Sequence, residues 1–218
     1  MTPPFGFPVL LELSGRRCVV IGSLPVREGK VEALLGGGAT EVLVVATDPA
    51  DLLDELEPVE GVTVARRAWT AADLTDAFLV IAHDRDPRVR ARLSTAARSA
   101  GALVNIIDDI PACDWAMPAI VRRGELLIAI GTGGASPALA RKVRERLETE
   151  YSPEWAEVVR VLREVRTETM PLLPDFAERS RRWREALDPD EAAALVRSGD
   201  VDELRNRLVH RLLDGVRP

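Results

Sequence analysis

The sequence predicts an α/β protein with a doubly wound parallel sheet and a helical C-terminal region. In the first half of the chain, short aliphatic runs alternate with stretches that carry apolar residues at helical spacing. Alternation of this kind is typical of parallel sheets covered by helices on both faces. The apolar share of 46% allows a real core, and the aromatic share of 4% makes that core aliphatic. The strand–helix order changes after about residue 111, and from Ser152 onward the pattern is helical only.

The expected strands are short aliphatic runs bounded by turn residues. They are Arg17–Ile21, Glu41–Ala46, Val62–Ala65, Ala77–Ala82, Ala102–Ile107 and Leu126–Ile130. Two of the helices have clear start signals. Asp86-Pro87 and Ser136-Pro137 each place a capping side chain before a proline at the first helical position. Gly101 is expected to end the first of these two helices.

Composition and charge argue against several classes of function. The formal net charge is −6, and Lys and Arg are spread along the chain, so nucleic-acid binding is not expected. No apolar stretch approaches the roughly 20 residues that span a bilayer, and the first residues do not resemble a signal peptide. The two cysteines, Cys18 and Cys113, show no disulfide framework or zinc spacing. We therefore expect a cytoplasmic protein that binds neither a membrane nor a resident metal ion.

The first strand runs into a turn that is a weak candidate for a nucleotide site. Dinucleotide-binding turns carry Gly-x-Gly-x-x-Gly/Ala, whose second glycine lets the backbone approach the pyrophosphate. Here Gly22 is kept, while Leu24 and Arg27 stand at the second and third positions. The candidate cofactor-binding residues are Gly22, Ser23, Leu24, Pro25, Val26, Thr47 and Asp84, and Asp48 is a weak candidate for the ribose. An ordinary strand–turn–helix without a nucleotide explains the turn equally well.

An acidic pair, Asp108-Asp109, follows Asn105 at the end of the fifth expected strand. Ligands of open parallel sheets gather at the carboxyl ends of strands, and a carboxylate there can accept or pass on a proton. The like charge of the neighbouring acid tends to raise one pKa of such a pair. A helix cap or a solvated turn is the alternative explanation of the pair.

A second glycine-rich turn, residues 131–137, precedes the helix that carries Leu139 and Leu147 on one face. Its glycines expose backbone N–H groups just before a helix N-terminus, which is a place where carboxylate or phosphate groups bind. Arg122, Arg123 and Arg141 lie near in sequence. We therefore expect an anion site at this turn.

Several pieces of the chain resemble, in this order, the precorrin-2 dehydrogenase/sirohydrochlorin ferrochelatase family, which includes the N-terminal module of bacterial sirohaem synthase. They are Phe7–Val9 with Leu13–Arg16, Ala77–Ala82, Leu103–Asp109, Cys113–Ile120 and Gly131–Ala140, and Glu178–Trp183 resembles the family's final helical region. The resemblance covers nearly the whole chain. The pieces around Asp108 and around Gly133–Pro137 are specific to the family.

The resemblance implies a Rossmann-type domain over residues 1–111, a dimerisation segment over 112–148 and a helical C-terminal domain over 149–218, in a homodimer. It implies NAD-dependent oxidation of precorrin-2 to sirohydrochlorin and, in some members, insertion of Fe2+ as a substrate, so the chain would be an oxidoreductase and lyase of porphyrin biosynthesis. Asp108 is the expected catalytic residue. The expected tetrapyrrole-binding residues are Asn105, Thr132, Gly133, Gly134 and Ser136.

The departures from the family gather on the nucleotide side. Leu24 and Arg27 replace two small residues, and His83-Asp84 replaces the usual Ala-Thr after the fourth strand. This pattern predicts weak NAD+ binding with the tetrapyrrole side kept, so a chelatase without nucleotide and a non-catalytic tetrapyrrole-binding dimer remain as alternatives. His83 is a candidate metal ligand or proton carrier, although a structural role is commoner for such a histidine, and His210 is expected to be solvated.

Overall fold

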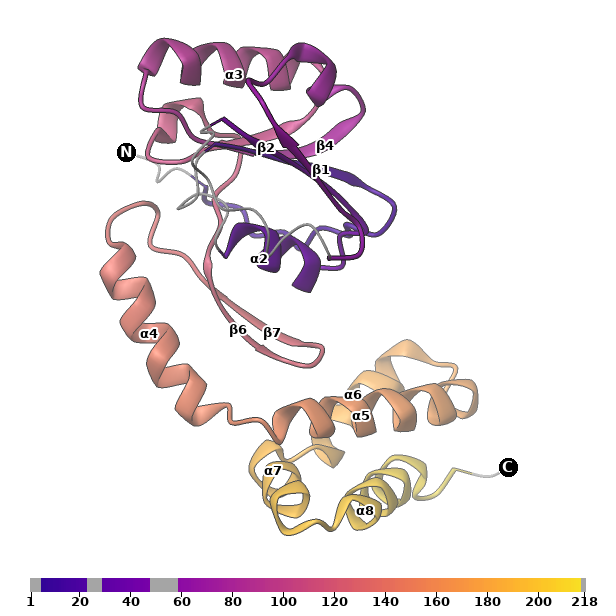
Figure 1. Cartoon of the computed structure of the whole chain (residues 1–218). Helices are drawn as coiled ribbons and strands as arrows, with labels where there is room; N and C mark the ends of the chain where they lie inside the picture. Colours follow the sequence, from indigo (N-terminus) through magenta and orange to yellow (C-terminus); the bar gives the residue numbers. More distant parts are fainter. Residues whose placement is uncertain (1–4, 23–28, 48–58, 217–218) are drawn as a thin grey trace. The chain divides into compact units, whose positions relative to one another are not determined.

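The computed structural model describes residues 5–22, 29–47 and 59–216. The chain divides into two compact units, Met1–Met117 and Pro118–Pro218. The first holds the parallel sheet, and the second holds a β-hairpin followed by helices (Figure 1). The fold class predicted from the sequence is therefore confirmed. The finer division into residues 1–111, 112–148 and 149–218 stays a prediction.

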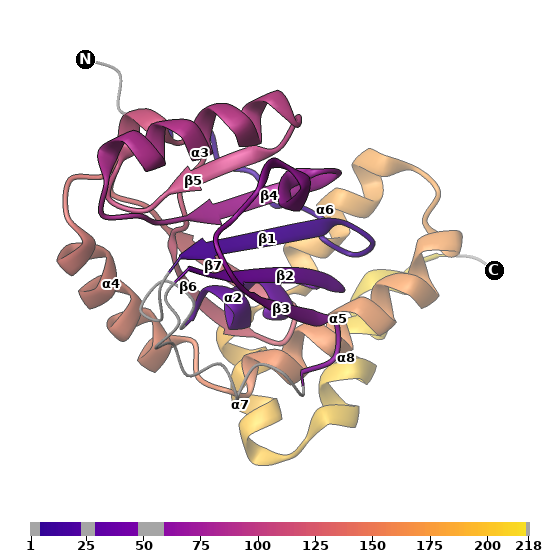
Figure 2. The same cartoon turned by 45° about the horizontal axis from the view of Figure 1, so that its top comes forward.

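Five parallel strands form the sheet of the first unit. They are β1 (Arg17–Gly22), β2 (Glu41–Ala46), β3 (Val62–Arg66), β4 (Ala77–Ala82) and β5 (Leu103–Ile106), and they lie in the order β3-β2-β1-β4-β5 (Figure 2). The chain runs outward from β1 to β3 and then returns to the other side of β1. The neighbours β1 and β4 therefore mark the switch point, where ligands of doubly wound sheets gather.

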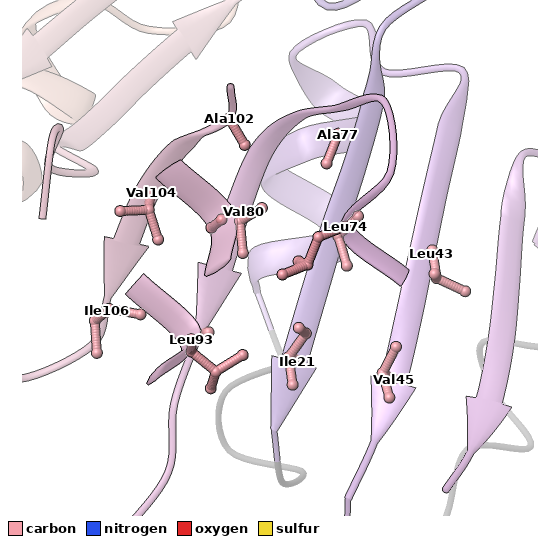
Figure 3. Close-up of a cluster of buried hydrophobic side chains, with 13 residues drawn as sticks. Ile21, Leu43, Val45, Leu74, Ala77, Val80, Leu93, Ala102, Val104 and Ile106 are labelled. Carbon is pink, nitrogen blue, oxygen red and sulfur yellow. The ribbon is translucent and has the colours of Figure 1, made fainter. Parts of the chain in front are cut away.

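Side chains of the strands alternate between two aliphatic cores, one on each face of the sheet. On one face, Ile21 and Val80 pack with Leu93 of α3 (Pro87–Ser99) (Figure 3). On the other face, Val20 packs with Val31 of α2 (Lys30–Gly36). Burial on both faces explains why these strands read as continuous aliphatic runs. Each fully buried side chain of this kind contributes about 1.5–3 kcal/mol to stability.

The predicted caps of α3 are present. The carboxylate of Asp86 accepts a hydrogen bond from the N–H of Arg88 at 2.8 Å, and Pro87 is the first helical residue. Beyond the last turn, Gly101 has a φ of +82°, a left-handed conformation that favours glycine. Local sequence signals therefore fix where this helix begins and ends.

Asp73, in the short 3₁₀ helix η1 (Ala71–Leu74), is a buried carboxylate with strong partners. Its two oxygens accept hydrogen bonds from the terminal nitrogens of Arg67 at 2.6 and 2.7 Å, and one of them accepts from the N–H of Thr70 at 2.7 Å. Because Arg67 favours the ionised form, the pKa of Asp73 is lowered from 3.8 to about 2. This ion pair ties down the connection between β3 and β4.

Stability is expected to fall in acid partly through Asp73. Its pKa is lower in the folded state than in the unfolded chain, so its contribution is complete above about pH 4 and is lost as the pH falls through about 2. The variant Asp73→Asn is expected to unfold with a free energy about 1–2 kcal/mol lower at neutral pH, allowing for the exposed side of Arg67. Denaturant unfolding of both proteins at neutral and acidic pH measures this. An identical pH dependence in the two proteins would contradict the role given to Asp73.

The chain after β5 passes through the 3₁₀ helix η2 (Ile110–Ala112) and then covers the free edge of that strand. The N–H of Asp114 donates to the carbonyl of Val104 at 2.8 Å, and its carboxylate accepts from the N–H of Val104 at 3.1 Å. The N–H of Ile106 donates to Sγ of Cys113 at 3.1 Å. An open strand edge invites pairing with other chains, so this segment protects the sheet. Burial raises the pKa of the Cys113 thiol. We therefore assign Cys113 a structural role.

The second unit begins with an antiparallel hairpin of β6 (Ala119–Arg123) and β7 (Leu126–Ile130). The helices that follow are α4 (Pro137–Glu150), α5 (Trp155–Thr169), α6 (Phe176–Ala186), α7 (Pro189–Ser198) and α8 (Val201–Leu213), with the 3₁₀ helix η3 (Met170–Leu172) after α5. A separate aliphatic core joins α5 to α8 through Val161 and Leu208. The strand β6 was not predicted, because three apolar residues followed by two arginines show no alternation. Among the described helices, none is long and apolar enough to cross a membrane.

Candidate functional site

The carboxyl ends of four strands lie in register at one edge of the sheet. Gly22 of β1 lies opposite Ala46 of β2, and Ala82 of β4 lies opposite Ile106 of β5. The candidate residues that this register brings to the same edge are Gly22, Thr47, His83, Asp84 and Asp108. Residues far apart in sequence therefore gather where ligands of such sheets bind.

Gly22 occupies a place that admits only glycine. Its φ is +143°, and a Cβ built on it would lie 3.0 Å from the carbonyl oxygen of His83. The main chain also joins here, because the N–H of His83 donates to the carbonyl of Ile21 at 2.9 Å. The end of β1 and the turn after β4 are thus packed backbone to backbone, and Gly22 permits the tight turn that the first glycine of a dinucleotide-binding motif provides.

Asp108 has an unusual backbone and no partner for its side chain. Its φ is +62°, a left-handed value that few residues other than glycine adopt, although Asp and Asn tolerate it better than most. Its side chain is exposed, and among the described residues its carboxylate makes no hydrogen bond or ion pair. Strained residues of this kind cluster at active sites. The carboxylate is therefore free to meet a ligand.

The neighbouring acid, Asp109, is already neutralised. Its carboxylate lies 3.2 Å from Nε of Arg90, and both side chains are largely buried. The same guanidinium donates to the carbonyl of Asp84 at 3.0 Å, so Arg90 links the turn after β4 to the turn after β5. Asp109 therefore has its own cation, so the two neighbouring acids have different surroundings: one is ion-paired and the other is exposed.

Arg90 was missed from the sequence, although a signal was present. A cation in the first turns of a helix lies at the positive end of the helix dipole, where it is unfavourable unless it has an acidic partner.

Asp84, expected to bind a cofactor, accepts a hydrogen bond from the N–H of Asp86 at 2.8 Å and so shapes its own turn.

The side chain of Asn105 forms a hydrogen bond with the segment that covers the edge of β5. Its Nδ2 donates to the carbonyl of Trp115 at 2.9 Å, and the indole N–H of Trp115 donates to the carbonyl of Leu103 at 3.3 Å. Asn105 therefore positions the loop beside Asp108. Its role in substrate binding stays a prediction.

The glycine-rich turn before α4 has the geometry that its sequence suggested. Gly133 and Gly134 have φ values of +59° and +80°, and the N–H of Ala135 closes the turn on the carbonyl of Thr132 at 3.0 Å. The hydroxyl of Thr132 accepts from the N–H of Ser136 at 3.2 Å, and the hydroxyl of Ser136 caps the N–H of Leu139 at 3.1 Å. Both side chains thus rigidify the turn.

Two backbone N–H groups of this turn have no acceptor among the described residues. Within residues 5–22, 29–47 and 59–216, no group accepts a hydrogen bond from the N–H of Gly133 or Gly134. Of the three nearby arginines, Arg123 donates to the carbonyl of Tyr151 at 2.6 Å and Arg141 pairs with Glu145 at 3.0 Å. Arg122 is exposed and has no carboxylate partner in the described part of the chain. The turn can therefore receive an anion, whereas Arg122 lies opposite Leu127, three residues along the hairpin from Ile130.

Some candidates lie outside the described residues. They are Ser23, Leu24, Pro25, Val26, Arg27 and Asp48. Asp108 belongs to the first unit and the turn before α4 to the second. Among the described residues, no three His, Cys, Asp or Glu side chains lie close enough to hold a metal ion.

Two sequence families match the chain in succession. One, described as putative NAD(P)-binding, covers residues 9–119, and the other, described as the sirohaem biosynthesis protein central region, covers residues 123–150. Their boundary falls at the start of the hairpin β6–β7. The matches therefore follow the two compact units.

Similar curated proteins carry the name siroheme synthase. Those of Methylococcus capsulatus and Azotobacter vinelandii are each 32% identical over 93% and 97% of this chain, and that of Nitrosospira multiformis is 36% identical over 83%. The aligned region covers 42%, 45% and 39% of those three proteins. The chain thus spans about two fifths of the length of the relatives it matches.

A solved structure has the same fold. The protein named SirC, precorrin-2 dehydrogenase, superposes with a TM-score of 0.67 over 93% of this chain and 98% of its own, at 24% identity. This likeness shows the fold, and the two family matches, which cover the sheet and the segment after it, show the family. The chain belongs to the sirohaem biosynthesis family whose putative NAD(P)-binding region matches residues 9–119 and whose central region matches residues 123–150.

Proposed function

We propose that the chain is an enzyme of sirohaem biosynthesis that acts on a tetrapyrrole, as an NAD-dependent precorrin-2 dehydrogenase, a sirohydrochlorin ferrochelatase or both. Its relatives named siroheme synthase and the dehydrogenase that shares its fold support this assignment. The relatives are longer than this chain, so their further activities are not assigned to it. The proposal rests on one observation, the left-handed backbone and exposed carboxylate of Asp108.

Asp108 is the proposed proton acceptor. Its backbone is left-handed, and its carboxylate is exposed at the carboxyl edge of the sheet with no partner among the described residues, so it is available to a ligand. Dehydrogenation of the macrocycle releases a hydride and a proton, and insertion of Fe2+ displaces the protons of pyrrole nitrogens. One carboxylate can accept the proton of the dehydrogenation and, in the insertion, can take up the two pyrrole protons one after the other, passing the first to solvent.

The turn before α4 is the proposed anchor for substrate carboxylates. Gly133 and Gly134 offer backbone N–H groups beside the N-terminus of α4. Hydrogen bonds of this kind to charged groups are worth about 1.5–3 kcal/mol each. Thr132 and Ser136 contribute by fixing the shape of the turn, with their hydroxyls already engaged.

The described part of the nucleotide edge fits a dinucleotide. Gly22 has the positive φ and the close backbone contact that the turn requires, and Thr47 and Asp84 lie at the same edge. NAD, when bound, would supply the hydride acceptor. Leu24 stands where a glycine lets the backbone approach the diphosphate, and Arg27 stands where a small residue lets the helix pack on the strand. Both favour a second candidate function, a chelatase with weak nucleotide binding.

We expect the chain to form a homodimer in solution. We also expect it to be located in the cytoplasm. Leu139 of α4 is 54% exposed, and Val143 and Leu147, on the same face of the helix, are only half-buried. An apolar stripe left open in this way suits a partner helix or strand. Sedimentation at micromolar concentration should show a dimer, and Leu139→Glu with Val143→Glu should give a monomer. The variant Arg141→Glu, on the opposite face of α4, should remain dimeric; a monomeric parent protein would contradict the proposal.

Turnover assays separate the candidate functions. Purified full-length chain is mixed with precorrin-2 with and without NAD+, and with sirohydrochlorin and Fe2+ without nucleotide, and the products are followed by absorption. NAD-dependent conversion supports the dehydrogenase, and metal insertion alone supports the chelatase. Tetrapyrrole binding with neither reaction would leave only a binding protein and would refute the enzymatic proposal.

A further inference from the structure

A pocket lies wholly within the helical part of the chain, between α5 and α6. Its volume is about 340 Å³, in the range of small-ligand sites. Arg166 of α5 and Arg179, Ser180 and Arg184 of α6 line it, with Trp183 and other apolar side chains. No acidic residue is among those that line it. The pocket is therefore positively charged.

The three arginines differ from the rest of this helical region. Every other arginine described in α5–α8 forms an ion pair with a glutamate; these are Arg160, Arg163, Arg181, Arg182, Arg197, Arg205, Arg207 and Arg211. Across the described ranges, Arg166, Arg179 and Arg184 have no carboxylate partner. Three unpaired guanidinium groups lining one pocket repel one another, so an anion between them would relieve the repulsion.

Arg179 is already held in position. One of its terminal nitrogens donates to the carbonyl of Leu173 at 2.7 Å, and its guanidinium lies 5.8 Å from the ring centre of Phe176. A guanidinium has five N–H donors, so several stay available to a ligand. An arginine fixed before binding loses little conformational freedom when the ligand arrives.

The pocket also presents an aromatic surface. Phe176 is 74% exposed, so its ring is accessible to a ligand. The indole N–H of Trp183 is buried and, within the residues described, has no acceptor, although buried donors nearly always have a partner. The exposed ring suits a ligand with an apolar face, and the guanidinium groups suit acceptor oxygens.

We propose that this pocket binds a flat organic anion that carries several carboxylates. Guanidinium groups match carboxylates as paired hydrogen-bond donors. Three of them on two helices, next to aromatic rings, suit separate carboxylates around one flat body better than a compact tetrahedral anion. This site is distinct from the Asp108 edge of the sheet and does not depend on the function assigned there.

Calorimetric titration of the full-length chain with trimesate, a benzene ring with three carboxylates, tests the proposal. Citrate has the same number of carboxylates without the ring, benzoate has the ring with one carboxylate, and inorganic phosphate represents a compact anion. Trimesate is expected to bind about tenfold or more tightly than each of these. Failure to bind trimesate, or tighter binding of phosphate or citrate, would overturn the proposed ligand class.

Matched variants locate the site. Arg166→Gln with Arg184→Gln is expected to weaken trimesate binding about tenfold or more without changing the melting temperature, because neither side chain has a carboxylate partner in the described structure. Arg181→Gln removes a charge from the same helix outside the pocket and should leave the affinity unchanged. Equal weakening by Arg181→Gln would show general charge attraction and would overturn the assignment of the pocket.

Discussion

Replacing Asp108 by asparagine is expected to reduce tetrapyrrole turnover by about two to four orders of magnitude, the usual effect of losing a general acid or base. Asparagine keeps the size of the side chain and tolerates the left-handed backbone at this position, where φ is +62°. It removes only the ability to accept a proton. Binding of the tetrapyrrole should change little, because the proposed anchors for its carboxylates lie in the turn before α4.

The melting temperature of Asp108→Asn makes the test specific. Within the described part of the chain the Asp108 carboxylate has no partner, so its loss should leave stability unchanged. If Asp108 merely capped a turn, the variant would lose about 0.5–2 kcal/mol and keep its activity per folded molecule. Asp109→Asn should show that second pattern, since it breaks the ion pair with Arg90. Full activity of Asp108→Asn would rule out its catalytic role.

The double variant Leu24→Gly with Arg27→Ala is expected to strengthen NAD+ binding by an order of magnitude or more. Leu24 stands where the backbone should approach the diphosphate, and each charge-assisted hydrogen bond regained is worth about 1.5–3 kcal/mol. Both residues lie outside the described structure, so the expectation rests on their place in the sequence after Gly22.

Isothermal titration with NAD+ measures the effect of this double variant. Leu24→Val keeps a branched side chain at the same position and should leave binding as weak as in the parent protein. Tight NAD+ binding by the parent protein, unchanged in the double variant, would show that the turn accommodates Leu24 and would contradict the prediction.

The sheet could be predicted because its signals are local. The strands β1, β2 and β4 are aliphatic runs whose ends are marked by turn residues, and burial on both faces keeps those runs continuous. The caps Asp86 and Ser136 are read within three residues of the helices they start. The hairpin strand β6 was missed because Arg122 and Arg123 hide its alternation.

Much of the site depends on contacts between distant residues. The sequence pointed to Asp108 and Asp109 as a pair, yet Arg90, nineteen residues before Asp109, changes their relation by neutralising one of them. The hydrogen bonds by which Asp114 and Trp115 close the edge of β5 likewise leave no local pattern in the sequence. No local pattern shows that Arg166 shares a pocket with Arg179 and Arg184 of another helix.

Titration of sirohydrochlorin into the full-length chain without nucleotide, followed by addition of Fe2+, tests the central claim most directly. The claim is that the tetrapyrrole side of the protein is retained, with Asp108 as its proton acceptor, whatever the strength of NAD+ binding. The expected result is saturable binding by the parent protein and, if it is a chelatase, metal insertion that is lost in Asp108→Asn. Absence of tetrapyrrole binding, both with and without NAD+, would contradict the claim.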